Sequence, residues 1–517
     1  MLLILTASKD AYITNKIVDG SYRVTDANTG HAGTLDIFKL YDESSIDGES
    51  EPIELSRALL KFDYQKIKDL TGSVIDLNSS NFKCELVLKD VSAGQITPRD
   101  FNLILFPLSK SFDEGIGKDV TLFSDLDNVN FLTASYSDGA DSVWHLSGAN
   151  RQGYLGSTDI DIISSGTLSG SNNDESTDLF VTQNFVSGDE DLKMNITTIV
   201  SASLAGLITN HGFRLSYSGT EETDSKTRFV KRFASRHVRK KILRPQIQVS
   251  FDDTIHDHHN SFFFDLSGSL FLNNFHRGRE ANLVSGSALS TVSGPDCLLL
   301  TLQSGSYTKF VTASQHTGST LGDGLPGVYS ASFAVPSNDS TVVDFGTTIS
   351  QMVDRTGSIT FDEYWSNFER TVSYYSGSVT LSAPNRTGFN YVSRRPDVHV
   401  TNGRSSYKNT DIVRFRVFGV DYEEDYKKSV KYRIKKPSVI FDKVYYRVVD
   451  SRTKEEVMPY KESNNGTRLS TDSEGQFFNF RMDNLFEGKS YMFEFLIEDR
   501  GVEYKVLDDR FKFKVEK

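Results

Sequence analysis

The chain has 517 residues, which at roughly 100–200 residues per domain suggests several domains. Its 57 Lys and Arg against 69 Asp and Glu give a net charge of −12, which excludes a general nucleic-acid binder, and its 12% aromatic content excludes a disordered chain. It contains 2 cysteines, Cys84 and Cys297, which excludes a disulfide scaffold and a cysteine-based zinc site.

The first residues predict a strand. Residues 1–6 are apolar but follow no basic segment, so they do not form a signal peptide, and we expect the chain to be made in a reducing cytosol. No apolar run approaches the roughly 20 residues that cross a bilayer, so we expect no membrane insertion.

Short alternating apolar runs, separated by Ser, Gly, Asn and Asp, recur along the chain. Residues 84–88, 101–105, 412–418 and 491–497 are examples, and such runs are typical of β-sandwiches and barrels. One weak helix is expected at residues 364–370. The sequence therefore predicts an all-β fold.

We divide the chain into three β-sandwich modules in series, comprising residues 1–250, 251–395 and 396–517. The first boundary follows residues 246–249, which alternate like a closing strand. The second boundary lies where Pro396 interrupts a strand ladder.

Blocks of the first module resemble a known family. Residues 9–13 (KDAYI), 33–37 (GTLDI) and 56–63 (SRALLKFD) are followed by 106–115 (FPLSKSFDEG), and 211–215 (HGFRL) and a closing segment at 233–247 come last. This order resembles the DNRLRE-type β-sandwich, a galactose-binding-like jelly roll related to carbohydrate-binding modules. The resemblance implies binding to a glycan or to another surface.

Within these blocks, Ala58, Leu60 and Phe62 alternate with more polar neighbours, which predicts a strand with one apolar face. A sugar site needs an aromatic platform beside polar groups, and Trp144, next to His145, is the best candidate for a glycan platform. The alternative is a tryptophan packed in a loop or core, as large aromatic residues usually are.

A basic segment, residues 226–244, contains nine Lys or Arg and no acid. It predicts a patch that docks an acidic partner surface, and the alternative is the solvated face of an edge strand. No recognition helix accompanies it, so we expect no nucleic-acid partner. The candidate docking residues are Arg232, Arg236, Arg239, Lys240, Lys241 and Arg244.

No metal, cofactor or catalytic site is expected. Residues 252–259 (DDTIHDHH) offer metal-ligand donors, but a linker or a loop at a strand end is the favoured interpretation. The chain has no Gly-x-Ser-x-Gly elbow, P-loop or His-Glu-x-x-His, so we do not expect an enzyme. Glycoside hydrolysis needs two carboxylates that face each other at a fixed separation, and this arrangement in space stays an open possibility at this point.

The second and third modules also show resemblances. Residues 327–335, Trp365 and 374–381 resemble immunoglobulin-like domains of tailed-phage virion proteins, with Trp365 as a core anchor. Residues 444–491 resemble fibronectin-III-like modules of marine phage virion proteins. There, the spacing Leu485-x-x-Gly488-x-x-Tyr491 resembles the corner at which a tyrosine binds nearby backbone.

Together these resemblances imply a non-enzymatic structural protein of a tailed-bacteriophage virion, in the tail, baseplate, neck or fibre. It would assemble in the host cytoplasm, be present in several copies or as a homo-oligomer, and dock other virion proteins. The alternative is a carbohydrate-binding protein that recognises a host surface glycan through residues 1–250. A polysaccharide-degrading enzyme has the least support.

Overall fold

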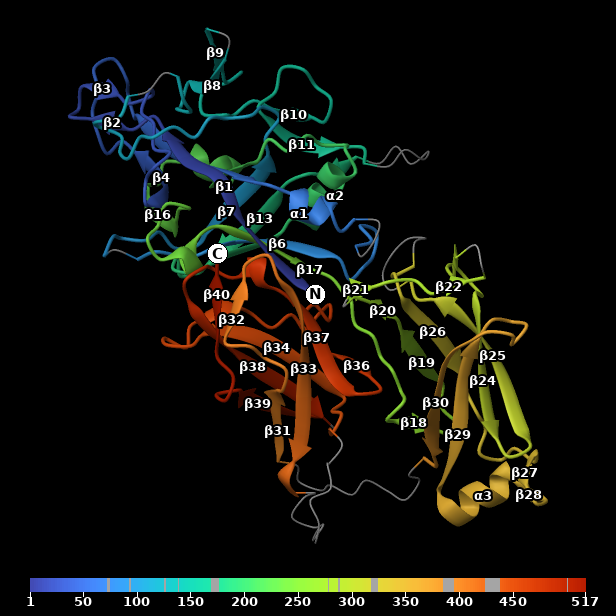
Figure 1. Ribbon diagram of the computed structural model, residues 1–517. Coiled ribbons are helices and arrows are strands. Elements are labelled where there is room, and N and C mark those ends of the chain that lie inside the picture. Colours follow the sequence, from blue (N-terminus) through green and yellow to red (C-terminus); the bar gives the residue numbers. More distant parts are fainter. Residues whose placement is uncertain are drawn as a thin grey trace. The chain divides into compact units, whose positions relative to one another are not determined.

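The computed structural model describes residues 1–517 except 72–74, 93, 125–126, 138, 169–175, 278, 287–288, 318–323, 385–394, 424–437 and 500. Strands dominate these residues (Figure 1), which confirms the all-β prediction and the series of β-sandwiches. The α-helices of the described residues are α1 (Gln65–Lys68), α2 (Thr197–Leu204) and α3 (Ile349–Thr356).

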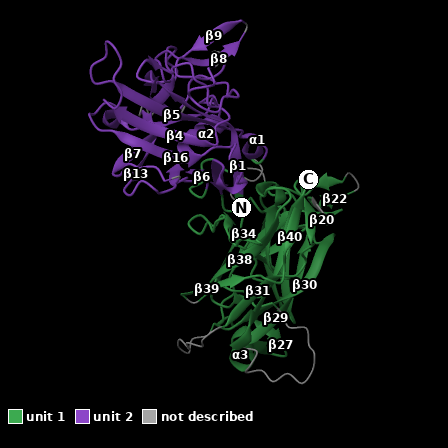
Figure 2. Cartoon of the chain, turned by 90° about the vertical axis from the view of Figure 1, so that its left-hand side faces the viewer, with its two compact units in different colours: residues 1–2, 70–81, 251–517 green, residues 3–69, 82–250 purple. Residues whose placement is uncertain are grey.

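The chain divides into two compact units (Figure 2). Unit 2 comprises residues 3–69 and 82–250, and unit 1 comprises residues 1–2, 70–81 and 251–517. The boundary after Ser250 coincides with the end of the predicted first module. Unit 1 holds both later modules, and the predicted boundary between them borders residues 385–394, which lie outside the described residues, so that division stays a prediction.

Unit 2 is built on one ten-stranded sheet. Its main path runs β13-β7-β15-β5-β1-β17-β6-β14, and β4 pairs with both β5 and β16. The strands of this sheet are β1 (Leu2–Thr14), β4 (Thr34–Tyr41), β5 (Ile53–Phe62), β6 (Lys83–Leu88), β7 (Phe101–Pro107), β13 (Val181–Phe185), β14 (Leu192–Asn195), β15 (Phe213–Tyr217), β16 (Arg228–Ala234) and β17 (Gln246–Ser250).

The remaining strands and 3-10 helices of unit 2 are short. They are β2 (Ile17–Val18), β3 (Tyr22–Arg23), β8 (Thr133–Ser137), β9 (Ala140–Val143), β10 (Gln152–Tyr154), β11 (Ile162–Gly166), β12 (Thr177–Asp178) and the 3-10 helices η1 (Gly219–Glu222) and η2 (Lys241–Leu243).

Strand β5 is buried on both faces, whereas its sequence predicts one apolar face. Ala58, Leu60 and Phe62 are fully buried, and so is Leu59, which points to the opposite face because side chains alternate along a strand. Leu59 belongs to a second core that includes Phe112 and Trp144 from the segment after β7. That segment therefore covers the face of β5 that the alternating pattern predicted to be exposed to solvent.

The first sheet of unit 1 has seven strands in the order β18-β30-β29-β24-β25-β26-β19. Trp365 is fully buried in its core, which confirms the prediction of a core anchor. Its strands are β18 (Phe262–Phe263), β19 (Gly268–Asn273), β24 (Leu298–Ser304), β25 (Tyr307–Gln315), β26 (Val328–Phe333), β29 (Ser358–Ser366) and β30 (Ser373–Ser382), with the short strands β20 (Phe275–His276), β21 (Arg279–Glu280), β22 (Val284–Ser285), β23 (Ser290–Thr291), β27 (Val342–Asp344) and β28 (Thr347–Thr348).

The helix expected at residues 364–370 is wrong. Tyr364 to Ser366 continue β29, where pairing with β30 outweighs weak helix propensity. The helix lies earlier, at α3, because Thr348 and Gln351 form a capping box at its start and Gly357, with φ of 72°, ends it.

The second part of unit 1 has a four-stranded and a six-stranded sheet. They meet across an aromatic core, in which Phe415 and Phe478 of one sheet contact Phe493 of the other at ring separations of 5.1 Å each. The first sheet contains β31 (Pro396–Val400), β33 (Ile412–Asp421), β36 (Ser470–Asp472) and β37 (Gly475–Arg481). The second contains β32 (Ser406–Lys408), β34 (Lys443–Asp450), β35 (Glu456–Met458), β38 (Ser490–Asp499), β39 (Val502–Leu507) and β40 (Phe513–Glu516), and the 3-10 helix η3 (Met482–Asn484) precedes β38.

The predicted tyrosine corner is present in this part. The Tyr491 hydroxyl donates a hydrogen bond to the Phe486 carbonyl oxygen at 2.7 Å, across the turn that contains Gly488. Gly488 has φ of 80°, which explains why the turn uses glycine. The spacing of Leu485, Gly488 and Tyr491 therefore correctly predicted a specific hydrogen bond.

Candidate functional site

The basic segment begins two residues before β16, and two of the cations within β16, Arg228 and Lys231, are neutralised within unit 2. Lys231 is fully buried and its ammonium lies 2.5 Å from Asp90 Oδ1. Arg228 pairs with Asp224 at 2.7 Å, and the hydrogen bonds that it donates to this carboxylate raise the pKa of the guanidinium. These side chains hold β16 in place and are not available to a partner.

Three of the predicted docking residues are only partly exposed. Arg232 binds both carboxylate oxygens of Asp36, at 2.7 and 2.6 Å, and Arg236 lies 3.4 Å from Glu114. Arg244 is partly buried. This burial lowers the pKa of its guanidinium, and repulsion from Arg236 is a second, smaller cause. Arg232, Arg236 and Arg244 are thus partly buried, and Arg232 and Arg236 lie beside carboxylates that are distant in the sequence, so their part in a docking patch stays a prediction.

The remaining candidates form an exposed group, which we call the cationic turn. Arg239, Lys240 and Lys241 are all exposed, in the connection between β16 and β17 where η2 begins. These three side chains are more exposed than Arg232, Arg236 and Arg244, so the docking prediction depends most on this turn.

Trp144 does not form a glycan platform. Its side chain is 4% exposed, and its indole Nε1 donates a hydrogen bond to the Asn130 carbonyl oxygen at 3.1 Å. The ring packs in the core with Phe112 and Phe131, over the outer face of β1 and β5. A ring that is covered on both faces cannot stack on a sugar, so the assignment is corrected and Trp144 is a core residue.

The carboxylate of Asp161 fixes the loop that carries Trp144. It accepts hydrogen bonds from the backbone amides of His145, Leu146 and Arg151 at 2.8, 2.9 and 3.0 Å. Arg57 supports the same loop by donating to the Gly148 carbonyl oxygen at 2.6 Å. This loop is therefore held by buried polar contacts and not shaped as an open binding surface.

The histidines of residues 252–259 have separate partners. His256 is mostly buried, and burial lowers its pKa to about 4. His258 Nδ1 accepts a hydrogen bond from the Ser269 amide at 3.1 Å, and His259 lies between Asp257 and Glu363. The segment runs along β36, where the Asp257 amide donates to Thr471 Oγ1 at 3.0 Å. It is a structural connection, in line with the favoured interpretation.

A different set of donors comes together in unit 2, which we call the acid–histidine cluster. Asp10, Glu114 and His237 each place one donor atom within 4.8 Å of the others. His237 Nε2 lies 3.2 Å from Glu114 Oε1, and the same oxygen accepts a hydrogen bond from the Asp10 amide at 2.9 Å. The three residues come from β1, the turn after β7 and the segment after β16.

Asp10 is the most perturbed member. It is 1% exposed, and burial raises the pKa of its carboxyl to about 7, although hydrogen bonding from the Arg236 amide opposes this. Its Oδ2 accepts that hydrogen bond at 2.5 Å, while Oδ1 is buried and accepts none. A buried oxygen without a donor is costly and marks a position that needs an explanation.

The position of Glu114 is set by a buried asparagine. Asn28 donates from Nδ2 to the carbonyl oxygens of Glu114 and Val129 at 2.9 and 2.8 Å, and its Oδ1 accepts from the Gly117 amide at 2.8 Å. Gly117 must be glycine here, because a Cβ atom would lie 1.9 Å from the Asn28 carbonyl oxygen. The turn that carries Glu114 is therefore held rigidly beside β1.

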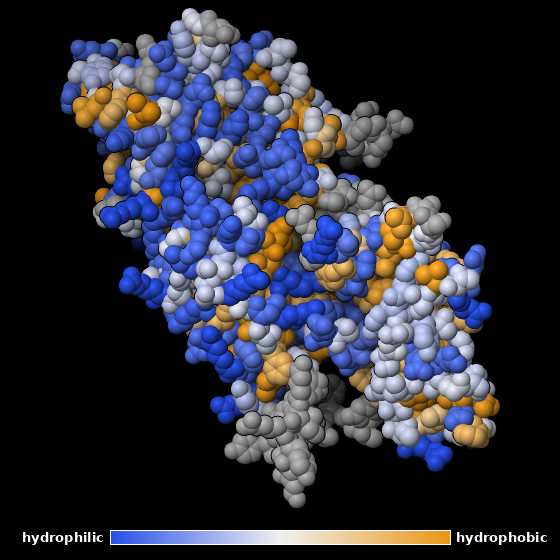
Figure 3. Space-filling model, viewed as in Figure 1, coloured by the Kyte–Doolittle hydropathy of each residue, from blue (hydrophilic) through white to orange (hydrophobic). Residues whose placement is uncertain are grey.

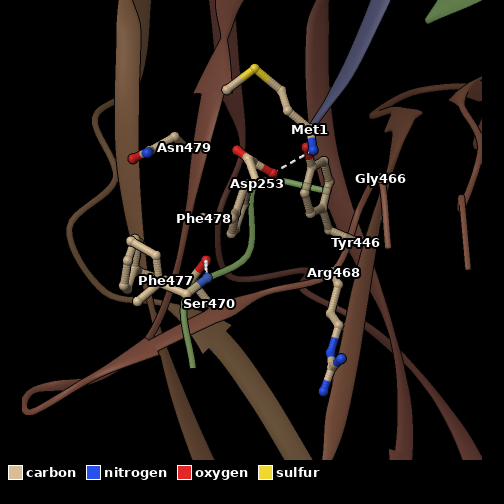
Figure 4. Close-up of a pocket in the computed structure, with 10 residues that line it drawn as sticks. Met1, Asp253, Tyr446, Gly466, Arg468, Ser470, Phe477, Phe478 and Asn479 are labelled. Atoms are coloured by element: carbon tan, nitrogen blue, oxygen red, sulfur yellow. Dashed lines mark hydrogen bonds and ion pairs between the residues drawn. The ribbon is translucent and has the colours of Figure 1, made fainter. Parts of the chain in front are cut away.

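A small cavity in unit 1 is lined by Met1, Asp253, Tyr446 and Arg468 among others (Figure 4). Its volume of about 20 Å³ is enough for roughly one water molecule. The Met1 amino group fills one side by donating to the Phe251 carbonyl oxygen at 2.5 Å and by pairing with Asp253. The cavity is too small for an organic substrate.

Apolar side chains are scattered over the face shown in Figure 3, in small patches between polar ones. Phe345, in the turn between β27 and β28, is fully exposed. Within the described residues, no helix is long and apolar enough to span a membrane.

No protein-family model and no curated protein matches the chain. Among solved structures, the N-terminal Ig1-2 module of the Drosophila receptor protein tyrosine phosphatase DLAR is similar, with 10% identity over 48% of this chain and 91% of that chain and a TM-score of 0.13. The titin fragment A168169 (7% identity, 52% and 98% coverage, TM-score 0.14) and the BSP domain of a biofilm-associated protein (9%, 94% and 68%, 0.15) are also similar.

Proposed function

We propose that this chain is a non-enzymatic structural protein that docks other proteins, and that it is a component of a tailed-phage virion. The cationic turn carries the proposal. Arg239, Lys240 and Lys241 are exposed on a chain of net charge −12, and they lie next to each other in the connection between β16 and β17. Local positive charge on an acidic surface favours an acidic partner surface.

The acidic surface itself explains why such a turn is useful in an assembly. Copies of an acidic protein, and acidic neighbours, repel each other at short range. A compact group of three exposed cations offsets that repulsion at one place and so selects one orientation of approach. Exposed charges at the rim of an interface mainly set the association rate and the choice of partner.

The assignment to a virion rests on the sequence. Residues 444–491 and the segment around Trp365 resemble modules of phage virion proteins, and β-sandwiches in series suit a rigid part with several docking surfaces. The tail, neck, baseplate and fibre are all consistent with it. Carbohydrate binding through residues 1–250 has less support, because burial of Trp144 removes the aromatic platform that this alternative used.

The test is a charge reversal of the cationic turn in the full chain, R239E/K240E/K241E. We expect the variant to fold normally and to be incorporated poorly into particles, with a defect that grows at low ionic strength, where charge repulsion is least screened. The matched control is K68E/K118E/K193E, which makes the same charge change at three exposed lysines of unit 2. Equal incorporation of both variants would overturn the docking role of the turn.

Binding of the full chain to a glycan array provides the discriminating experiment for the alternative. Specific binding to host surface glycans, unaffected by charge reversal of the cationic turn, would favour a carbohydrate-binding protein. Release of reducing sugars from a host envelope polysaccharide, abolished by substitution of one carboxylate, would instead reveal an enzyme.

A further inference from the structure

We propose that Asp10, Glu114 and His237 bind a divalent transition-metal ion of the Zn²⁺ type, which cross-links three segments of unit 2. From the sequence we expected no metal site, and the metal-ligand donors noted there lie in residues 252–259. The acid–histidine cluster lies elsewhere and is built from residues that are distant in the sequence. The proposal goes beyond the docking function and does not depend on it.

The geometry of the donors supports the proposal. One donor atom each from Asp10, Glu114 and His237 lies within 4.8 Å of the others, so an ion placed among them can reach all three with small side-chain movements. Zinc binds imidazole nitrogen and carboxylate oxygen at about 2.0–2.2 Å. Glu114 Oε1 already accepts a hydrogen bond from the Asp10 amide at 2.9 Å and lies 3.2 Å from His237 Nε2.

An unpartnered oxygen is the second, independent observation. Asp10 is 1% exposed, and its Oδ1 atom is buried without a hydrogen-bond donor. Leaving a buried acceptor unsatisfied is costly, and more so for a charged group. A bound cation supplies the missing partner, which explains why an acidic residue occupies a buried position of β1.

The donor chemistry selects the class of ion. Mg²⁺ and Ca²⁺ prefer sites made of oxygen atoms, whereas an imidazole nitrogen with two carboxylates suits Zn²⁺ and its first-row neighbours. His237 supplies the imidazole nitrogen of this donor set through Nε2, which lies 3.2 Å from Glu114 Oε1. The His31 ring lies 4.3 Å from the His237 ring, tilted from it by 35°.

Two guanidinium groups limit the affinity. Arg236 lies 3.4 Å from Glu114, and Arg244 contributes a second positive charge near Asp10. These charges compensate the two carboxylates when no ion is bound, and they oppose an added cation. We therefore expect a single site of moderate affinity that stabilises the fold and supports no catalysis.

The position of the site gives it a structural role. His237 is two residues before the cationic turn, and Asp10 follows a register shift in β1 between Ala7 and Lys9. An ion held by β1, by the turn after β7 and by the segment after β16 fixes the base from which Arg239 to Lys241 project.

The test is titration of the full chain with ZnCl₂ by isothermal calorimetry, after treatment with a chelator. We expect one site in the wild type, and binding weaker by more than about 100-fold in His237→Gln and in Asp10→Asn, since even loss of an outer-shell partner costs 10–100-fold. The controls are His145→Gln, an exposed histidine of unit 2, and His258→Gln in the histidine-rich segment; both should bind like the wild type.

A second measurement separates loss of binding from loss of folding. Zn²⁺ should raise the melting temperature of the wild type and of both controls, and leave that of a folded His237→Gln variant unchanged, with folding checked by circular dichroism. The proposal is overturned if the wild type binds no Zn²⁺, or if His258→Gln and not His237→Gln removes the binding.

Discussion

His259 lies between two carboxylates, and its Nε2 atom hydrogen-bonds Glu363 Oε2 at 2.8 Å. Its Nδ1 atom faces Asp257 Oδ1 at 2.6 Å. Because ionised carboxylates only accept, both ring nitrogens carry protons and the ring is charged. Burial alone would lower the pKa of His259, but the hydrogen bonds and charges of Asp257 and Glu363 outweigh it and raise this pKa to about 10.

This contact predicts that unit 1 loses stability at alkaline pH. A base whose pKa is higher in the folded than in the unfolded state stabilises fully below the unfolded value, and the effect is lost as pH rises through the folded value. The interval here runs from 6.5 to about 10. We expect the free energy of unfolding in urea to fall across it, and more steeply in the wild type than in His259→Gln.

The same variant should be strongly destabilised at the lower end of the interval, by about 3–5 kcal/mol, because two buried carboxylates lose the cation between them. His258→Gln is the control and should keep the wild-type pH dependence. Identical pH profiles for His259→Gln and the wild type would contradict the charged state of His259.

Trp144→Ala should lower the free energy of unfolding by about 3–5 kcal/mol, as expected for removal of a large core side chain. The indole is 4% exposed and packs over β1 and β5. Leu146→Ala, at a side chain that is 51% exposed in the same loop, should change stability by less than about 0.5 kcal/mol. Urea denaturation followed by circular dichroism measures both, and similar small effects would place Trp144 at the surface.

Glu222→Gln should be among the most damaging conservative substitutions in unit 2. Arg57 is 2% exposed and donates to both oxygens of Glu222, at 2.9 and 2.7 Å. Removing one charge of a buried pair costs about 3–5 kcal/mol. The exposed pair of Arg23 with Glu49 offers the matched control, since Glu49→Gln should have a far smaller effect on the unfolding free energy.

Tyr491→Phe should cost about 0.5–1.5 kcal/mol, the net contribution of one hydrogen bond. The lost bond is the one from the Tyr491 hydroxyl to the Phe486 carbonyl oxygen. Tyr504→Phe on β39 removes a partly exposed hydroxyl and serves as the control. If the two substitutions have equal effects on unfolding in urea, the corner does not stabilise the fold.

Local patterns in the sequence predicted much of the fold. Alternation identified strands such as β6, β7 and β33, and the spacing around Tyr491 identified the corner. The helix at α3 was missed although its signal was present, since Thr348 and Gln351 have capping-box spacing and Gly357 follows. The burial of both faces of β5 was not predictable, because the covering segment follows β7.

The candidate site depends on contacts that no local pattern reveals. Arg232 pairs with Asp36, which is 196 positions away, and His237 contacts Glu114 at a separation of 123. A run of cations was therefore visible in the sequence, but its neutralisation was not. Trp144 shows the same limit. It was chosen as an aromatic residue next to a polar one, and that pattern contains no information about which side chains cover the ring.

We propose that this chain docks other virion proteins through the cationic turn. The most direct test is to search for the chain in purified tailed-phage particles whose genome carries its sequence, by electron cryo-microscopy with mass spectrometry of the same particles. We expect density for both units in the tail, neck, baseplate or fibre, with an acidic neighbouring surface facing Arg239, Lys240 and Lys241. Particles that lack the chain, or density in which these side chains face open solvent in every copy, would contradict it.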